Sequence, residues 1–291
     1  VDSLDTAGPL TQSQLEEFRT QGYTTLKQAY DSKTSASIQD KLWEYMESAS
    51  SMRRDDPNTW TIERYGIAET FTGTPYRDAY TPRLCSAFDQ LMGTGKWEES
   101  NFGLGWWVVS FPGFWDDALE DDPTLEWGAA GSWHVDGAHF QHHIDSKEVG
   151  LLPIFLFSEI GSHDGGTLLC PGSHHVVARI LHEHRLQGGV EGMRGTDVSA
   201  EAIARCGDAN GIIQHWVEVQ GSPGDVVLCH PFMLHARSMN CGRALGRSVR
   251  PMCHPAISLK EDMNVLTPNA TLSSLSIVER TIQEAIVDAT Q

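Results

Sequence analysis

Gly131-Ser-Trp-His-Val-Asp-Gly137 is the stretch from which the rest of the chain can be interpreted, because it places His134 two residues before Asp136. In an extended segment, residues two apart project their side chains from the same face. One imidazole and one carboxylate on one face supply two of the three ligands of a 2-His-1-carboxylate site, which holds Fe(II) in oxygen-activating enzymes. The stretch therefore predicts part of a metal site that still needs a second histidine.

The composition narrows the class of protein. The chain has 291 residues, of which 40% are hydrophobic, so it can bury the core of one large β domain with added helices. The formal net charge of −18 argues against nucleic acids and anionic membranes as partners, because both bind basic surfaces. Composition leaves the oligomeric state undetermined.

Cysteine usage and hydropathy indicate a cytoplasmic protein. The six cysteines include no C-x-x-C pair, which disfavours a zinc ribbon or a dense disulfide scaffold and is typical of reduced thiols. The first residues contain no apolar signal-peptide core. The longest apolar run, from Val149 to Phe157, is interrupted by Pro153 and is too short to span a bilayer.

The first third of the chain, about residues 10–95, has helical patterns. Thr11-Gln-Ser-Gln14 resembles a capping box and predicts a helix through about Arg19, followed by a short strand over residues 23–26. Apolar spacing predicts a second helix over about 35–48. Thr81-Pro82 is typical of a helix start, and this third helix is expected to end at Gly93. Residues 50–80 appear irregular.

From about residue 100 the pattern becomes extended. We expect a closing helix over about 274–287, a helix around 175–184, and an unpatterned insertion up to about 210. Pro251 and Pro255 place the last candidate strand at a sheet edge or a bulge. With no internal repeat or linker, residues 1–291 are expected to form one domain, with a helical flank (about 10–95), a β core (about 100–258) and a C-terminal helix (about 273–288). The expected strands cover residues 104–111, 149–157, 167–170, 212–219, 224–229 and 247–257.

The missing ligand is expected to be a histidine on a distant strand of the same sheet. Among 13 histidines, His235 stands out, because a Pro-Gly turn, the hydrophobic strand 224–229 and a second turn precede it. His235 as a hydrogen-bonded core residue is the competing interpretation. His139, His142 and His143 form an alternative metal cluster, although their loop context favours a solvated or substrate-facing role.

Taken together, these motifs resemble the phytanoyl-CoA dioxygenase family of Fe(II)/2-oxoglutarate oxygenases. The matching pieces are Trp133-His-Val-Asp136, Gly165-Gly-Thr with Pro171-Gly-Ser-His174, and Gly224-Asp with His230-Pro, His235, Asn240 and Arg247. Their order and spacing agree with the family over the central half of the chain, and the N-terminal pattern of Leu-Thr, Phe and Gly-Tyr is also similar.

The resemblance implies a double-stranded β-helix, a jelly-roll of two antiparallel sheets with flanking helices. It implies that His134, Asp136 and His235 bind Fe(II), and that 2-oxoglutarate chelates the metal. Arg247 is the family-matched anchor for the far carboxylate, with Ser238 or Thr167 assisting, since a guanidinium grips a carboxylate bidentately. Arg250 is the alternative anchor, although on a regular strand it would face away from the side that Arg247 faces.

The activity implied is oxidation of a small molecule by O₂, with decarboxylation of 2-oxoglutarate to succinate and CO₂. Because Asp136 occupies the position that related halogenases leave empty, hydroxylation is the expected outcome, while desaturation and ring formation stay open. Trp107, Phe140 and Arg237 are the candidate substrate contacts. The alternative function is a cupin-like metal-binding barrel without redox chemistry, either a binding protein or a metal-dependent isomerase.

Overall fold

The computed structural model describes residues 8–99, 102–114, 132–189, 191–241, 249–266 and 274–288. Its centre is a six-stranded sheet in which every neighbouring pair is antiparallel. In spatial order the strands are β1 (Tyr23–Leu26), β11 (Val226–Cys229), β7 (Leu152–Leu156), β13 (Arg250–Cys253), β5 (Trp107–Ser110) and β2 (Arg64–Ile67).

A smaller antiparallel sheet packs on one face of the large one. Its strands are β10 (Val217–Glu218), β8 (Leu168–Leu169) and β12 (His235–Ala236). Two strand pairs complete the described β structure, β3 (Phe71–Thr72) with β4 (Gly103–Leu104) and β6 (Gln141–His142) with β9 (Met193–Arg194).

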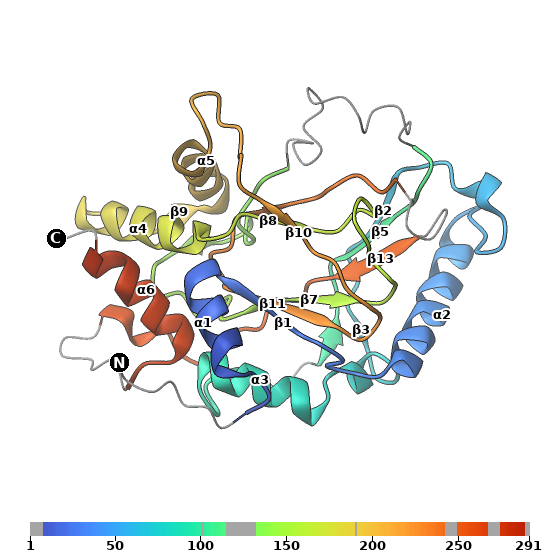
Figure 1. The fold of residues 1–291 in the computed structure, drawn as a ribbon, viewed down its shortest axis with the longest axis horizontal. Helices are drawn as coiled ribbons and strands as arrows, with labels where there is room; N and C mark the ends of the chain where they lie inside the picture. Colours follow the sequence, from blue (N-terminus) through green and yellow to red (C-terminus); the bar gives the residue numbers. More distant parts are fainter. Residues whose placement is uncertain are drawn as a thin grey trace.

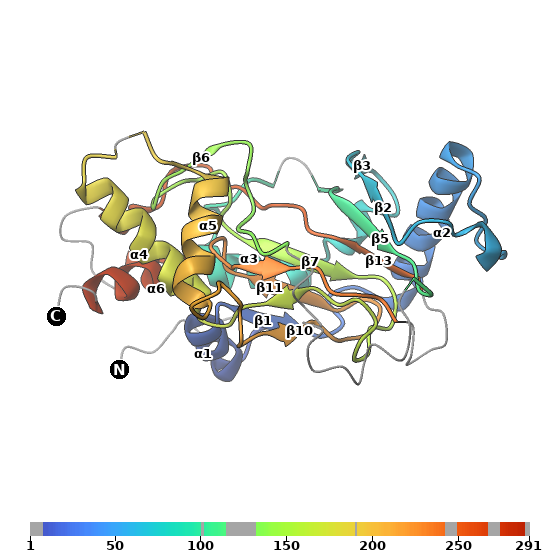
Figure 2. The same ribbon diagram turned by 90° about the horizontal axis from the view of Figure 1, so that it is seen from above.

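The helices gather mainly at one end of the sheets. In Figure 1, α4, α5 and α6 lie together at that end with α1 beside them, whereas α2 lies at the opposite end. Figure 2 shows the same separation from above. The α-helices are α1 (Gln12–Gln21), α2 (Ser32–Ala49), α3 (Pro82–Met92), α4 (Ser173–Leu186), α5 (Gly195–Cys206) and α6 (Ile277–Asp288), and short 3-10 turns cover Pro57–Thr59, Arg77–Ala79 and Asn264–Leu266.

Alternation along the strands of the large sheet divides the core into two parts. On β7, Leu152, Ile154 and Leu156 share a cluster with Leu169 of β8, so this face is covered by the small sheet. The opposite face of β7, through Phe155, belongs to the larger cluster that includes the apolar sides of α1, α2 and α3. Residues two apart on a strand share a face, so Arg250 and Met252 both point between the sheets.

The helix predictions from capping motifs are confirmed. Thr11 and Gln14 form the capping box of α1, and Gly22 ends this helix with left-handed backbone (φ 83°). Thr81 caps α3, which has Pro82 in its first turn and ends at Gly93. The strand over residues 23–26 is present with the expected bounds.

Four expectations differ from the structure. The region 50–80 contains β2 and β3, and the insertion before residue 210 contains α5. The expected strand over 104–111 is two strands, because Trp106 adopts left-handed backbone (φ 55°) between β4 and β5. Of the two placements predicted from proline, a sheet edge or a bulge, the edge is wrong, since β13 lies between β7 and β5. The sheet tolerates Pro251 because the pairing of β13 with β7 begins only at Met252.

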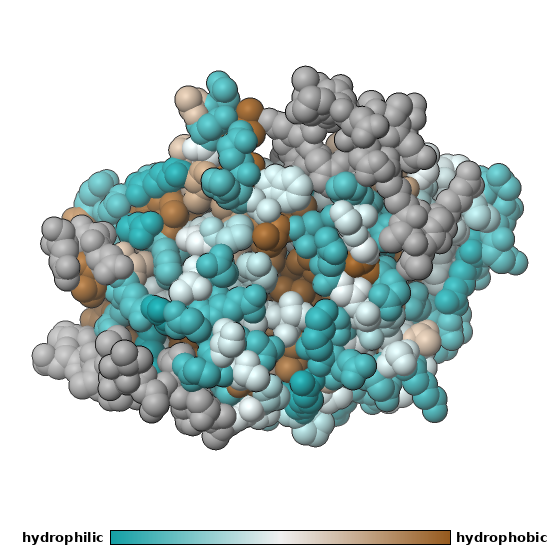
Figure 3. All heavy atoms as spheres, in the orientation of Figure 1, coloured by the Kyte–Doolittle hydropathy of each residue, from teal (hydrophilic) through white to brown (hydrophobic). Residues whose placement is uncertain are grey.

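No helix in the described ranges combines the length and apolar character needed to cross a bilayer. The face of the molecule shown in Figure 3 is largely hydrophilic, as the composition leads one to expect.

Asp225, in the Gly-Asp turn before β11, is a buried anchor between the sheet and the segment that follows β1. Its carboxylate lies 2.8 Å from Lys27 Nζ and accepts hydrogen bonds from the backbone N–H groups of Gln28 (2.8 Å) and Ser222 (3.0 Å). Asp225→Ala leaves these donors without partners, so we expect the free energy of unfolding to fall by about 2–4 kcal/mol. Urea denaturation measures the change, and a loss below about 0.5 kcal/mol would contradict the anchoring role.

Two buried histidines, His174 and His230, predict acid sensitivity. Their ring centroids are 5.0 Å apart, and His174 Nε2 lies 3.1 Å from the Arg19 carbonyl oxygen. Burial, with a smaller contribution from His175, lowers the pKa of His174 to about 3, and burial takes the pKa of His230 well below its ordinary value. In the folded state these two histidines therefore stay neutral at pH values below about 6.5, where the histidines of the unfolded chain bind protons.

Stability present above pH 6.5 is thus expected to fall as the pH drops toward 3, by about 1.4 kcal/mol per pH unit for each of these histidines. The measurement is urea denaturation of metal-free protein at pH 7.5 and pH 5.5. His174→Gln keeps a donor for the Arg19 carbonyl but cannot take up the proton, so its loss of stability is expected to be smaller. An equal loss of stability in the parent protein and in His174→Gln would refute a contribution of His174 to the acid sensitivity.

Candidate metal centre and adjoining cavities

Two segments far apart in the sequence bring the predicted ligands together. The backbone N–H of His134 donates to the His235 carbonyl (2.9 Å), and the N–H of His235 donates to the His134 carbonyl (3.0 Å). This reciprocal antiparallel bridge extends the small sheet beyond β12 and sets both imidazoles on one face, with ring centroids 4.3 Å apart. Asp136, two residues after His134, follows on the same side.

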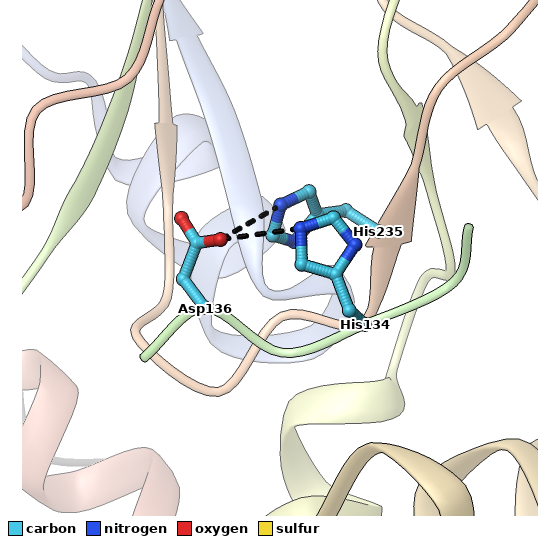
Figure 4. A group of neighbouring side chains, drawn as sticks. All are labelled: His134, Asp136 and His235. Carbon is cyan, nitrogen blue, oxygen red and sulfur yellow. Dashed lines mark ion pairs between the residues drawn. The ribbon is translucent and has the colours of Figure 1, made fainter. Parts of the chain in front are cut away.

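The ligand atoms of the three side chains converge on one point (Figure 4). Asp136 Oδ1 lies 3.2 Å from His134 Nε2 and 3.5 Å from His235 Nε2. Among the described residues, these three form the one group of His, Cys, Asp or Glu whose ligand atoms all lie within 4.8 Å of one another. The structure therefore assembles the set that the sequence predicted.

Backbone contacts orient both imidazoles. His134 Nδ1 lies 2.6 Å from the Ser132 carbonyl oxygen, and His235 Nδ1 lies 3.0 Å from the Met233 carbonyl oxygen. A carbonyl only accepts, so each Nδ1 carries a proton and Nε2 of each ring faces the centre, where it can bind a metal once it is unprotonated. Such contacts to the second ring nitrogen are typical of metal-binding histidines.

The carboxylate of Asp136 stays ionised in this environment. Burial by itself would raise its pKa, but the two adjacent imidazoles, His235 first and then His134, outweigh burial and hold the pKa well below the ordinary value. The centre therefore offers one carboxylate and two imidazole donors, a combination suited to a divalent cation.

Helix α5 fixes the backbone between His134 and Asp136. Ser199 Oγ accepts a hydrogen bond from the Val135 N–H (3.0 Å) and donates to the Gly195 carbonyl (2.7 Å). Gly195 lets the helix approach this segment, since a Cβ there would lie 2.8 Å from the Gly137 carbonyl oxygen. The region without a recognisable pattern in the sequence thus supports the metal centre.

A small cavity of about 200 Å³ lies between the sheets beside His134 and His235. Arg250 borders it, is only 3% exposed, and has two buried guanidinium nitrogens, Nε and Nη1, without a hydrogen-bond partner. Burial lowers its pKa to about 10, although the Glu218 carboxylate acts in the opposite direction. The group is therefore still cationic at neutral pH, and the cavity contains a buried charge in need of an anion.

The residues predicted to bind 2-oxoglutarate or the substrate do not all lie at the same cavity. Arg247 lies outside the described residues, so its side chain is not placed. Thr167 borders the small cavity and is buried. Ser238 Oγ instead donates to the Gly166 carbonyl (2.6 Å), and Ser238 is not among the described residues that border the cavity. Arg237 borders the small cavity rather than the larger one and lies 3.3 Å from Glu63.

A larger cavity of about 890 Å³ lies on the other side of the centre, which borders it through His134 and Asp136. Phe140, a candidate substrate contact, lines it. Trp107 does not, since its ring is buried in the core (1% exposed) and its indole N–H donates to the Leu104 carbonyl (2.9 Å). The neighbouring Trp106 lines the cavity instead, because its left-handed backbone directs it away from the core. Trp106 therefore replaces Trp107 as a candidate contact.

His254 is a residue of the centre that motif analysis missed. Its Nε2 lies 3.7 Å from Asp136 Oδ2, it borders both cavities, and its buried Nδ1 has no hydrogen-bond partner. Burial lowers its pKa to about 4 against the opposing influence of Asp136, so it is neutral near pH 7. The available signal was alternation, since Arg250, Met252 and His254 are spaced two apart and share the face between the sheets.

The alternative histidine cluster is not assembled. His142 is buried with its Nε2 3.1 Å from the Gly137 carbonyl oxygen and stacks on Phe140, and His139 stacks on Trp106. Within the described ranges, neither residue belongs to a group with converging ligand atoms, and the same is true of His143. The substrate-facing role considered for this loop agrees with His139 lining the larger cavity.

Comparisons with known proteins identify solved structures whose fold is similar to that of this chain. No protein-family model matches the sequence, and no curated protein matches it significantly. The crystal structure of EctD from S. alaskensis in its apoform is 18% identical, covers 88% of this chain and 79% of its own, and has a TM-score of 0.50. EctD with bound Fe gives the same values. EctD with 2-oxoglutarate and 5-hydroxyectoine is 16% identical over 88% of this chain and 78% of its own, with a TM-score of 0.50.

Proposed function

We propose that this chain is a non-haem Fe(II)/2-oxoglutarate-dependent dioxygenase that hydroxylates a small molecule. One observation carries the proposal: Arg250, a buried cation with unpaired nitrogens, shares a small cavity with His134 and His235. A metal centre alone explains the convergence of the ligand atoms, but it gives no reason to bury an unpaired guanidinium beside it. A dicarboxylate that bridges metal and guanidinium explains both.

The residues present fit a ferrous ion. His235 Nε2 is buried without a hydrogen bond, and it converges with His134 Nε2 and Asp136 Oδ1, the donor set of facial-triad sites. Bound there, Fe(II) supplies the redox chemistry that couples oxidation of 2-oxoglutarate to oxidation of the substrate by O₂. The Ser132 and Met233 carbonyls hold the two imidazoles in place.

The small cavity fits 2-oxoglutarate. We propose that Arg250, rather than Arg247, pairs with the far carboxylate, and that the hydroxyl of Thr167 assists. A carboxylate on Arg250 would direct the opposite, oxo-acid end of the molecule toward the histidines that border the same cavity. Leu152, Ile154 and Met252 also border it and limit access of water, which strengthens the charge pairing.

The fold supports the same reading. We propose that the two sheets form the double-stranded β-helix of the phytanoyl-CoA dioxygenase-like enzymes and that the chain is one such domain. The likeness to EctD, which has been solved with Fe and with 2-oxoglutarate, supports this assignment through the fold. A cupin-like barrel without redox chemistry is the second candidate, and the converging donors favour it equally, but Arg250 has no role in it.

An anaerobic titration distinguishes the two candidates. Fe(II) with 2-oxoglutarate is expected to give a weak visible charge-transfer band, whereas Fe(II) with succinate, which lacks the oxo group, is expected to give none. A folded, iron-loaded sample without the band would refute the dioxygenase. A succinate-release screen over candidate metabolites with Fe(II), 2-oxoglutarate and ascorbate then identifies substrates.

A further inference from the structure

The two cavities beside the centre differ in charge. Arg64, Arg237 and Arg250 all border the small cavity. The larger cavity has no Lys or Arg among the described residues that line it, and its acidic members are Asp136 and Glu148. If the small cavity holds the dicarboxylate, as the proposed function requires, the larger one is left for a substrate that needs no cationic partner. Its volume of about 890 Å³ lies within the range of small-molecule sites, about 300–1,000 Å³.

Trp106 is the unusual residue of the larger cavity. The residue is 57% exposed, although tryptophan is generally well buried, and its backbone is left-handed (φ 55°), a conformation that bulky residues rarely adopt. Strained backbone of this kind persists at ligand clamps, where function offsets its cost.

Trp106 belongs to a set of aromatic rings at the cavity wall. Its ring lies nearly parallel to that of His139, with an interplanar angle of 20° and a centroid distance of 6.2 Å. His139 contacts Phe140 edge-on at 5.2 Å, and Trp133 also lines the cavity. Aromatic faces bind flat rings by stacking and attract cations through their negative π-faces.

We propose that the larger cavity binds a ring-bearing amine, with Trp106 as the stacking platform and Glu148 as the partner of the ammonium group. Glu148 is exposed at the cavity, so its carboxylate is accessible to a ligand that enters from solvent. The same walls disfavour phosphorylated, coenzyme A-linked and carboxylate substrates, because none of the described lining residues balances their negative charge. The proposal names the substrate class of the proposed oxygenase and rests on that function.

Three probes with one ring and different head groups test the charge preference: naphthalen-2-ylmethylamine, naphthalen-2-ylmethanol and naphthalene-2-carboxylate. Their dissociation constants are measured by calorimetry and ligand-observed NMR on metal-free protein at pH 7.5, so that none of them is held by iron. The amine is expected to bind most tightly and the carboxylate most weakly. Equal affinities, or tightest binding of the carboxylate, would overturn the proposal.

Two variants separate ring recognition from structure. Trp106→Gly is expected to weaken binding of the amine about tenfold. The thermal midpoint of Trp106→Gly is expected to equal or exceed that of Trp106→Ala, because glycine adopts left-handed backbone without strain. Leu186→Ala, which removes another exposed apolar side chain (72% exposed), serves as the control and is expected to change neither the amine affinity nor the thermal midpoint. Unchanged amine affinity in Trp106→Gly would refute the stacking role.

Glu148→Gln tests the charge separately. It is expected to weaken the amine about two- to fivefold, as loss of an exposed ion pair does, and to leave the alcohol unchanged. Glu44→Gln on α2, at the other end of the molecule, is the matched control (Figure 1). The charge-transfer band reports the proposed oxygenase function independently of amine binding. A protein that gives the normal band but shows no preference for the amine would refute only the proposed substrate class. A protein that prefers the amine but gives no band would refute only the oxygenase function.

Discussion

Asp136→Ala is expected to reduce Fe(II) affinity by more than about 100-fold and to abolish succinate release. Loss of residues that only orient metal ligands typically costs about 10- to 100-fold in affinity or activity, so loss of the sole anionic ligand exceeds that range. The physical reason is charge, because His134 and His235 alone are neutral donors and would have to hold a dication in a partly buried site.

The measurement is an anaerobic iron titration followed through the 2-oxoglutarate charge-transfer band. Asp136 is outside the apolar core clusters, so far-ultraviolet circular dichroism of the metal-free variant is expected to match the parent protein. His143→Ala, from the alternative histidine cluster, is the matched control and is expected to keep the band. Retention of iron by Asp136→Ala, with loss in His143→Ala, would move the centre to that cluster.

Arg250→Met is expected to raise the KM for 2-oxoglutarate by about 30- to 5,000-fold, because truncating one partner of a buried charge pair costs about 2–5 kcal/mol. The same variant is expected to make the protein without ligand as stable as the parent or more stable. Removing a buried charge that has unpaired nitrogens relieves a desolvation penalty, and Met retains the apolar volume of the stem.

These opposite effects on binding and stability identify Arg250 as a ligand-binding residue rather than a structural one. Arg64→Gln is the matched control, since Arg64 borders the same cavity but is exposed to solvent. Its effect on KM is expected to be no more than about fivefold. The assignment of Arg250 as the 2-oxoglutarate anchor is wrong if Arg250→Met destabilises the free protein and leaves KM unchanged. Arg247 then becomes the anchor to test.

The convergence of the three candidate metal ligands was predictable because local geometry carries the information. His134 and Asp136 share a face by strand alternation alone, and His235 follows a turn-strand-turn pattern that places it at the start of β12. The caps of α1 and α3 were predictable for the same reason, since Thr11 and Thr81 bond to residues three positions away.

The cavities were not predictable in this way. The left-handed turn at Trp106 exchanges the places of two adjacent tryptophans, and aromatic residues on a predicted strand give no sign of it. Arg250 was ranked below Arg247 because Arg247 matches the family, and only the register of β13 between β5 and β7 shows that Arg250 points between the sheets. His254 has no motif of its own.

The sequence by itself determined which side chains converge on the centre, because strand alternation, capping and turns act over a few residues. Only the tertiary structure decided what surrounds them. The positions of Arg250, His254, Trp106 and Ser199 relative to the centre depend on how β13, β5 and α5 pack against segments more than 50 residues away in the chain. Such contacts are set by burial of apolar surface, which is non-directional and leaves no fixed spacing in the sequence.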